Sequence, residues 1–312
     1  MTKETLLEDI KVLTESSIGF ELFFVLKNRD IKKVHLDTTL YQNMQTEFTK
    51  KVLDTFNVDV DFTLKSVADL SDEKLESEYF YFDSDTMYDN LRFIIEFASQ
   101  TDTNLFQLGE NKYKDIDAIL IKIGTQSNNV ILYKHHYPIN VLSKKSTINI
   151  FKEGDTFKEV IDDVFKIDIN FDFLVVDEHI VINKLKTLET KFDYTEVIYA
   201  KAFENIEIIT ALDFVENLDM LKESIKTNKW AKKLNKVQGS PVIEIIRSNQ
   251  EKVINFIKSH PKLKQINFTG NDKLKLDTKV SVERFLKLLD DDYLHSQLTE
   301  MLYDTNSKDS VL

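Results

Sequence analysis

Residues 116–135 read IDAILIKIGTQSNNVILYKH, two apolar runs on either side of a short polar break. Both runs are rich in β-branched and aromatic residues and alternate in parts with a period of two, as strands do. The break at Gly124–Asn129 is typical of a hairpin turn. Residues 171–182, FDFLVVDEHIVI, repeat the pattern around a turn at Asp177-Glu178-His179. Parallel neighbours need crossovers of roughly a dozen residues or more, so these short spacings predict an antiparallel sheet.

The stretch that precedes this sheet, residues 1–110, predicts a mixed α+β portion. It opens with a helical pattern and continues with apolar runs at Phe20–Lys27 and Lys33–Asp37. These runs are typical of two strands around the polar turn Asn28-Arg29-Asp30. From Thr39 to Phe56, apolar residues recur every four positions, which indicates an amphipathic helix.

The chain changes to a helical period beyond residue 184. Ser240-Pro241 signals a helix start, because Ser can cap a helix and Pro tolerates its first turn. His260-Pro261 ends that helix, because the residue before a proline is driven out of α geometry. A short strand pair near residues 266–276 and a helix over Val280–Leu289 follow. Apolar residues three or four apart predict the other helices at Leu185–Phe192, Tyr194–Ile209, Phe214–Lys226, Lys229–Val237 and Val242–Ser259.

Together these patterns predict an α+β fold with an antiparallel β-meander core. We place a domain boundary near residue 112. Residues 1–112 then form an acidic α+β N-terminal portion. Residues 113–312 combine an antiparallel sheet at 113–184 with a largely helical part at 184–312.

The composition limits the classes of protein that the chain can represent. Its 312 residues are 42% apolar and 30% charged, as is ordinary for a folded globular protein. No apolar run approaches the roughly 20 residues that span a bilayer, and the acidic N-terminus does not resemble a signal peptide. The absence of Cys excludes disulfides, thiolate catalysis and Cys-ligated metal sites. We therefore expect a cytoplasmic protein.

The net charge of −12 is distributed unevenly along the chain. Residues 1–110 carry 11 Lys and Arg against 22 Asp and Glu. Residues 222–279 carry 14 Lys and Arg against 5 Asp and Glu. A local basic segment can bind phosphates even in an acidic protein, so the asymmetry hints at a polyanionic partner.

The sequence contains no recognisable catalytic motif. Its six glycines are scattered, so it has neither a Walker loop nor a dinucleotide fingerprint. His135 and His136 are adjacent on a predicted strand and should point to opposite faces, one exposed and one half-buried. Such a pair cannot easily share a metal. We expect no catalytic residue, no cofactor and no metal site.

Two acidic groups keep a metal-dependent nuclease open as an alternative. Asp177 and Glu178 with Lys184 superficially resemble the carboxylate and lysine set of such an enzyme, although a turn and a strand separate them. The run at residues 290–292, three aspartates, could bind a cation. It would be unfavourable beside the negative end of a helix dipole, and a solvated helix terminus is the other interpretation.

The strongest candidate site is basic and suggests DNA binding. Five lysines follow one another at spacings of 4, 3, 4 and 3 residues and would line one face of a continuous helix. If Thr227-Asn228 interrupts the helix, the lysines after it still cluster. Like charges at this spacing repel, and a polyanion would relieve the repulsion. The predicted DNA-binding residues are Lys222, Lys226, Lys229, Lys232, Lys233, Lys236 and Arg247. The other interpretation is a solvated lysine face on a scaffold that binds only protein.

Three long segments resemble the KwaB-like family of the bacterial Kiwa anti-phage system. They are ILYKHHYPINVLSK at residues 131–144, FKEGDTFKEVIDDVFKIDINFDFLVVDEHIVINKLKTLETKFDY at 151–194, and LDTKVSVERFLKLLDDDYLHSQLTEMLYDTNSKD at 276–309. The resemblance covers roughly residues 115–309 and carries no catalytic signature.

The resemblance implies a function and partners. It implies an anti-phage defence protein that binds duplex DNA without sequence specificity and blocks phage replication or late transcription. It also implies self-association into a dimer or a higher homo-oligomer. The small membrane protein KwaA would be the partner that recruits the chain to the inner membrane.

Overall fold

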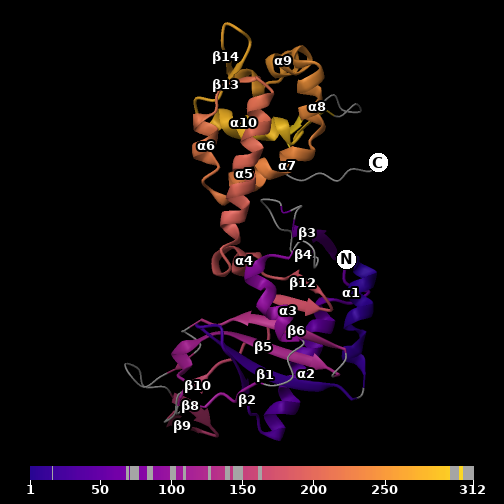
Figure 1. Ribbon diagram of the computed structural model, residues 1–312, viewed down its shortest axis with the longest axis vertical. Coiled ribbons are helices and arrows are strands. Elements are labelled where there is room, and N and C mark those ends of the chain that lie inside the picture. Colours follow the sequence, from indigo (N-terminus) through magenta and orange to yellow (C-terminus); the bar gives the residue numbers. More distant parts are fainter. Residues whose placement is uncertain are drawn as a thin grey trace. The chain divides into compact units, whose positions relative to one another are not determined.

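The computed structural model describes residues 1–15, 17–67, 70, 77–82, 87–98, 103–107, 110–125, 128–137, 141–142, 150–160, 164–295 and 302–304 (Figure 1). The chain forms two compact units. The first contains residues 1–67 and 75–192, and the second contains residues 68–74 and 193–312. We refer to them as the N-terminal unit and the C-terminal unit.

The N-terminal unit is built on an eight-stranded sheet with the order β2-β1-β5-β6-β11-β12-β4-β3. Every neighbouring pair is antiparallel except β3 and β4, which run parallel. The predicted antiparallel α+β fold is therefore confirmed. The strands are β1 (Gly19–Leu26), β2 (Ile31–Val34), β3 (Thr63–Ser66), β4 (Glu78–Phe82), β5 (Ile116–Gly124), β6 (Asn129–His135), β11 (Phe173–Val176) and β12 (His179–Ile182).

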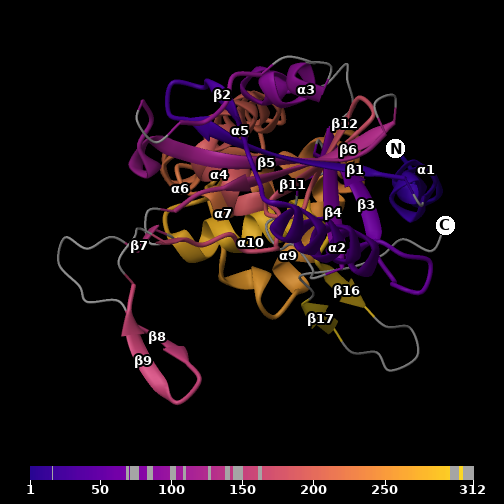
Figure 2. The ribbon, with the colours of Figure 1, turned by 90° about the horizontal axis from the view of Figure 1, so that it is seen from below.

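Four helices and two small strand pairs complete this unit. The helices are α1 (Lys3–Asp9), α2 (Thr38–Thr55), α3 (Arg92–Ala98) and α4 (Leu185–Lys191). One pair is β7 (Val141–Leu142) with β10 (Val164–Phe165). The other is β8 (Ile150–Glu153) with β9 (Thr156–Glu159), a hairpin that Figure 2 shows projecting away from the main sheet. Short 3₁₀ segments lie at Ile10–Thr14, Asp89–Leu91 and Tyr113–Asp115.

Apolar side chains cover both faces of the main sheet. On one face, Phe24 and Ile121 pack in one core with Phe48 of α2. On the other, the Phe23 ring lies 4.7 Å from the Phe97 ring of α3, measured between centroids. Alternation sends neighbouring side chains to opposite faces, so strands covered on both sides become apolar at nearly every position. This is why β5 and β6 are continuous apolar runs.

The hairpin between β5 and β6 depends on a glycine. Gly124 pairs with Asn129 at the end of the ladder and has a φ of +138°. A Cβ at Gly124 would lie 2.5 Å from the carbonyl oxygen of Asn128, so only glycine fits there. The predicted turns at this position, at Asn28–Asp30 and at Asp177–His179 all connect paired strands.

The N-terminal strands belong to the same sheet as the central ones. Our prediction placed a boundary near residue 112, but β1 pairs with β5 from Gly19 and Gly124 to Leu26 and Ile116. The compact units divide instead near residue 192.

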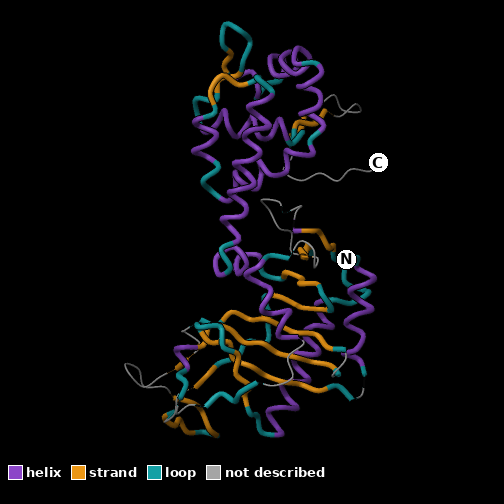
Figure 3. Tube along the Cα trace, in the orientation of Figure 1, coloured by secondary structure: helices purple, strands orange, loops and turns teal. Residues whose placement is uncertain are grey.

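The C-terminal unit is mainly helical, in contrast to the strand-rich N-terminal unit (Figure 3). A sheet of β13 (Val215–Asn217), β15 (Leu274–Lys275) and β14 (Asn267–Phe268) accompanies the helices, as does a pair formed by β16 (Tyr293–His295) and β17 (Leu302–Asp304). The 3₁₀ segments are Val237–Gly239 and Leu263–Gln265. The helices are α5 (Tyr194–Ala211), α6 (Asp219–Ser224), α7 (Asn228–Lys236), α8 (Pro241–Ser248), α9 (Gln250–Ser259) and α10 (Lys279–Leu289).

Two of the predicted helices are corrected here. The first part of Phe214–Lys226 is strand β13, which pairs parallel with β15, so only α6 is helical. The predicted helix Val242–Ser259 is two helices, because Asn249 leaves α geometry with φ −156° and ψ 77°. The Asn249 side chain then caps α9 by accepting from the Lys252 backbone N–H. The start at Ser240 is confirmed, since its hydroxyl accepts from the Val242 N–H at 3.1 Å.

In the part of the chain that the structure describes, no helix has the length and the apolar content needed to cross a bilayer.

Candidate nucleic-acid interface

The predicted lysine series lies on two helices rather than one. Lys222 belongs to α6, whereas Lys229 and the lysines that follow belong to α7. Thr227, the N-cap of α7, has extended backbone angles and separates the two helices. The continuous lysine face that the spacing predicted therefore does not form. The alternative, an interruption at Thr227-Asn228, is close to the observed break at residues 225–227, because Asn228 is already the first residue of α7.

Four of the seven predicted DNA-binding residues are exposed on the C-terminal unit: Lys222, Lys226, Lys229 and Arg247. Lys226 pairs with Glu223 at 2.5 Å, and Arg247 pairs with Glu244 at 2.6 Å. Both are exposed pairs between residues three apart, the first in the turn that follows α6 and the second within α8. Such pairs stabilise a protein by about 1 kcal/mol or less. A polyanion could replace either carboxylate at little expense, so all four cations remain candidates for phosphate contact.

Two of the predicted residues, Lys232 and Lys233, are buried. The Lys233 ammonium lies 2.7 Å from the Asp292 carboxylate and 3.9 Å from that of Asp290. Lys236, which is half-buried, lies 3.8 Å from Asp290. The local spacing could not show this, because α7 packs the stems of these lysines inside the unit. Because they are buried, Lys232 and Lys233 cannot contact DNA directly as the sequence predicted.

The acidic run at residues 290–292 is the counterpart of these lysines. It follows α10, and Asp291 has a φ of +55°, in the left-handed region that Asp tolerates better than most residues. Asp292 is 1% exposed. Two groups that the sequence suggested as separate sites, one basic and one acidic, thus neutralise one another. Fifty-nine residues separate Lys233 from Asp292, so no short-range pattern could link them.

The three residues of the N-terminal unit that suggested a nuclease do not lie together. Asp177 and Glu178 occupy the exposed turn between β11 and β12, whereas Lys184 follows the other end of β12. Within the described ranges, no three His, Cys, Asp or Glu side chains gather closely enough to hold a metal ion.

Lys184 instead belongs to a charge cluster around the buried carboxylate of Asp172, which the sequence analysis missed. Asp172 is fully buried, and its carboxylate accepts from the backbone N–H of His135 at 2.9 Å. The ammonium groups of Lys134 and Lys184 lie 3.8 Å and 3.7 Å from the same carboxylate. Asp168 makes a second ion pair with Lys134 at 3.1 Å. A lone Asp before the apolar run Phe173–Val176 was the signal that could have revealed a buried, paired carboxylate.

The two adjacent histidines are both buried, so the prediction that one would be exposed is wrong. The His136 ring stacks on Phe165 with centroids 4.8 Å apart, and the His135 ring meets Tyr137 edge-on at the same separation. Neither nitrogen of His136 has a hydrogen-bond partner among the described residues. Burial lowers the pKa of both imidazoles below the ordinary value of 6.5, and the positive charge of Lys191 lowers that of His135 further.

We expect the stability of the N-terminal unit to fall on mild acidification. The lowered pKa of each imidazole means that the unfolded chain binds protons more readily than the folded chain. The stabilisation is therefore complete above the unfolded pKa, near 6.5, and is lost as the pH falls through the lower folded value. Urea unfolding between about pH 7.5 and about pH 5.5 measures this loss.

A matched pair of variants identifies the residues responsible. His136→Phe removes the titrating ring while keeping the stack on Phe165, so the dependence on pH should become shallower. The matched control, His35→Gln, removes a histidine at an exposed position. An equal slope in His136→Phe and the unmodified protein would contradict the prediction.

Comparisons with known proteins bear on the whole chain. Residues 113–299, more than half of the chain, match the model of a family described as Kiwa protein KwaB-like. The chain belongs to the KwaB-like family. It is also 27% identical over 318 aligned residues to the Kiwa protein KwaB of Escherichia coli O55:H7 (strain RM12579 / EPEC), covering 100% of this chain and 99% of that relative. No solved structure matches the chain.

Membership of the KwaB-like family implies a role in anti-phage defence. The matched region runs from β5 to just beyond β16, so it includes the buried cluster around Asp172, the lysine helices α6 and α7, and the Lys233–Asp292 pair. The relative covers the N-terminal strands as well, in keeping with a single sheet that contains β1 and β5.

Proposed function

We propose that this KwaB-like protein binds duplex DNA without sequence specificity through exposed cations of its C-terminal unit. Binding along the phage genome would block replication or late transcription. The observation that carries the proposal is the exposure of the basic segment between residues 222 and 279. Its exposed cations are Lys222, Lys226, Lys229, Arg247, Lys252, Lys258, Lys262, Lys264 and Lys279.

The side-chain chemistry of this segment suits phosphates better than bases. All but one of the exposed cations are lysines, which act as point charges and lack the planar fork with which Arg reads guanine. Contacts with phosphates position a protein on DNA but carry no sequence information. The lysines therefore favour DNA binding that is strong at low salt and independent of the DNA sequence.

The proposal includes partners. The resemblance to Kiwa proteins supports recruitment to the inner membrane by the small membrane protein KwaA, and self-association into a dimer or a higher oligomer. A homo-oligomer would multiply the number of phosphates engaged at once, so avidity could offset weak contacts in each copy.

We also propose that binding, and not cleavage, is the activity on DNA. The support is positional: Asp177 and Glu178 lie at the opposite end of β12 from Lys184. The acidic run at 290–292 is engaged with Lys233 and Lys236.

The decisive experiment is a titration of labelled duplex DNA at a series of salt concentrations. The triple charge reversal Lys222→Glu, Lys226→Glu and Lys229→Glu should flatten the plot of log affinity against log salt. Each phosphate contact contributes a slope of about −0.9, so the slope should fall in magnitude by about 2 to 3. The matched control is Lys27→Glu, Lys50→Glu and Lys112→Glu, which makes the same charge change at exposed positions of the N-terminal unit.

Two outcomes would contradict the proposal. Equal slopes for the two triple variants would show that the exposed cations of α6 and α7 do not contact DNA. Cleavage of the DNA by the unmodified protein in the presence of Mg²⁺, together with no cleavage by the Asp291→Ala variant, would favour the nuclease alternative.

A further inference from the structure

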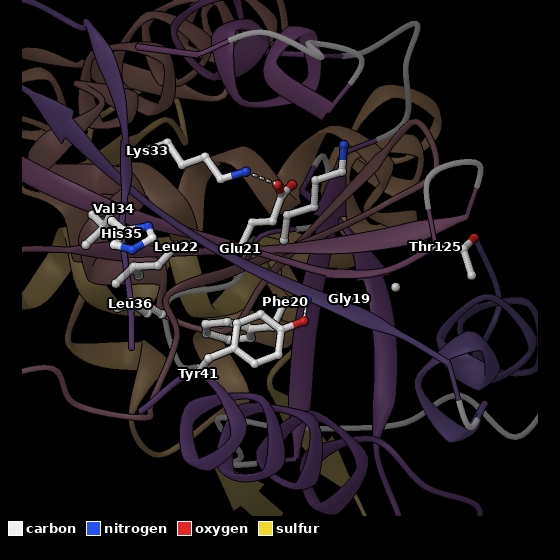
Figure 4. Close-up of a pocket in the computed structure, with 12 residues that line it drawn as sticks. Gly19, Phe20, Glu21, Leu22, Lys33, Val34, His35, Leu36, Tyr41 and Thr125 are labelled. Carbon is white, nitrogen blue, oxygen red and sulfur yellow. Dashed lines mark hydrogen bonds and ion pairs between the residues drawn. The ribbon is translucent and has the colours of Figure 1, made fainter. Parts of the chain in front are cut away.

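The opening between β1 and β2 results from an early end of their pairing. Leu26 donates its backbone N–H to the carbonyl of Asp30, and the ladder continues to Leu22 opposite Val34. The next partner of Phe20 would be Leu36, but β2 has already ended at Val34. The backbone N–H of Phe20 donates instead to the Tyr41 hydroxyl at 3.0 Å (Figure 4). The edge of β1 is therefore uncovered just where β2 departs.

A polar cavity of about 560 Å³ lies at this opening. Glu21 pairs in register with Lys122, so their side chains share one face of the sheet. Lys33 reaches the same carboxylate from β2 and forms an ion pair with it (Figure 4). Gly19 and Gly124 also face each other in register, which leaves bare backbone in the wall. Lys33 and Lys122 thus bring two ammonium groups to this cavity, and both can donate hydrogen bonds to an anion.

A second cavity of about 670 Å³ adjoins the first, and the two share the wall formed by Leu22, Val34, His35 and Leu36. Its remaining lining is apolar apart from Asn43 and Glu47 of α2. Leu40 and Ile169, which also line it, are 45% and 39% exposed. Both volumes are within the usual range for small-molecule sites, and the apolar lining of the second is typical of them.

We propose that these two neighbouring cavities together bind a small amphiphile with one aliphatic chain and an anionic head group. The head group lies near Lys33 and Lys122, which share the sheet face of Phe23. The aliphatic chain passes the opening beyond Val34 and lies against α2 on the other face. An aliphatic body fits better than a nucleobase, because the apolar cavity has few groups to satisfy the polar edge of a buried base. The proposal does not depend on DNA binding, which concerns the other unit.

Calorimetric titration of the full chain tests this proposal with four probes at concentrations below micelle formation. Decyl phosphate and decanoate share the chain and the negative charge and differ in the head group. Decyltrimethylammonium keeps the chain and reverses the charge, and inorganic phosphate lacks the chain. We expect both anionic amphiphiles to bind, and the cation and the inorganic ion to bind at least about tenfold more weakly, equivalent to about 1.4 kcal/mol.

Variants at two lining residues that solvent reaches, Lys33 and Leu40, locate the site. Lys33→Gln should weaken decyl phosphate about tenfold, because a hydrogen bond to a charged group is lost. Its control, Lys50→Gln, removes a lysine from α2 outside both linings. Leu40→Glu should weaken both anionic probes by a similar factor through repulsion and lost apolar contact. Its control is Val58→Glu, at a position that is 79% exposed.

Each of the following results would overturn the proposal. Equal affinity for the cationic amphiphile would mean that the ammonium groups play no part. Inorganic phosphate binding as tightly as decyl phosphate would make the site a simple anion site. Unchanged affinity in both Lys33→Gln and Leu40→Glu, or no binding of either anionic amphiphile, would exclude this pair of cavities.

Discussion

Replacing Asp292 with alanine should lower the free energy of unfolding of the C-terminal unit by about 3–5 kcal/mol. Asp292 and Lys233 form a 2.7 Å ion pair in which both side chains are at least nine-tenths buried. Alanine would leave the Lys233 ammonium inside the unit, where Asp290, at 3.9 Å, is the remaining carboxylate partner among the described residues. Losing one member of a buried pair is expensive because the remaining ion keeps its desolvation penalty.

The fluorescence of Trp230 makes this measurement specific. Trp230, the single Trp of the chain, lies on α7 three residues before Lys233, so it reports unfolding of the C-terminal unit. Urea unfolding followed by this signal gives the loss for Asp292→Ala. The matched control, Asp277→Ala, removes an exposed aspartate and should change the free energy of unfolding by less than about 0.5 kcal/mol.

A double variant separates the charge from the packing. Lys233→Met with Asp292→Leu removes both ions and keeps apolar volume, so it should be much closer in stability to the unmodified protein than Asp292→Ala is. If the single and double variants were equally destabilised, packing and not the uncompensated charge would explain the loss. The result also bears on DNA binding, because a Lys233 engaged with Asp292 should not contribute to the salt slope.

Asp172→Ala should lower the free energy of unfolding of the N-terminal unit by about 3 kcal/mol. The substitution removes the acceptor of the His135 backbone N–H and the carboxylate between Lys134 and Lys184. Lys134, whose side chain is 9% exposed, keeps the Asp168 carboxylate at 3.1 Å, so the loss should stay below that of an ion left wholly unpaired.

Hydrogen exchange resolves this effect at the residue concerned. The His135 amide should exchange markedly faster in Asp172→Ala, whereas Asp172→Asn, which retains a side-chain acceptor, should protect it better. Asp168→Ala serves as the control, because it removes the half-exposed partner of the same lysine and should change stability by about 1 kcal/mol or less. Unchanged exchange at His135 in Asp172→Ala would show that the carboxylate does not hold that strand end.

Much of the fold could be predicted because it depends on local periodicity. The runs around Gly124–Asn129 and Asp177–His179 became antiparallel hairpins, since short polar breaks between apolar runs leave few other solutions. The helix predicted over Thr39–Phe56 is α2 at Thr38–Thr55, and Ser240 starts α8 as expected. The two errors have different causes. Tertiary contact overrides helix propensity at β13, which forms because β15 pairs with it. Asn249 divides a periodic stretch into α8 and α9 by a local cap that periodicity does not detect.

The candidate sites were less accessible to sequence reasoning. The spacing of the lysines on α7 does not separate two cases, because it describes both a solvated face and a face that packs against aspartates from another part of the chain. Exposure separates Lys229 from Lys233, although both follow the same helical pattern. The Asp172 cluster was missed because its members come from three segments with no common period.

The sequence alone determined the α+β class, the hairpins, the charge asymmetry and the resemblance to KwaB-like proteins. These properties depend on residues close together in the chain, or on long segments compared as a whole. Only the tertiary structure decided which charges face solvent, that Lys233 meets Asp292, and that the departure of β2 from β1 opens a cavity beside Lys33. The physical reason is that burial and ion pairing are set by distance in space, and residues 59 apart in sequence become neighbours only after the chain has folded.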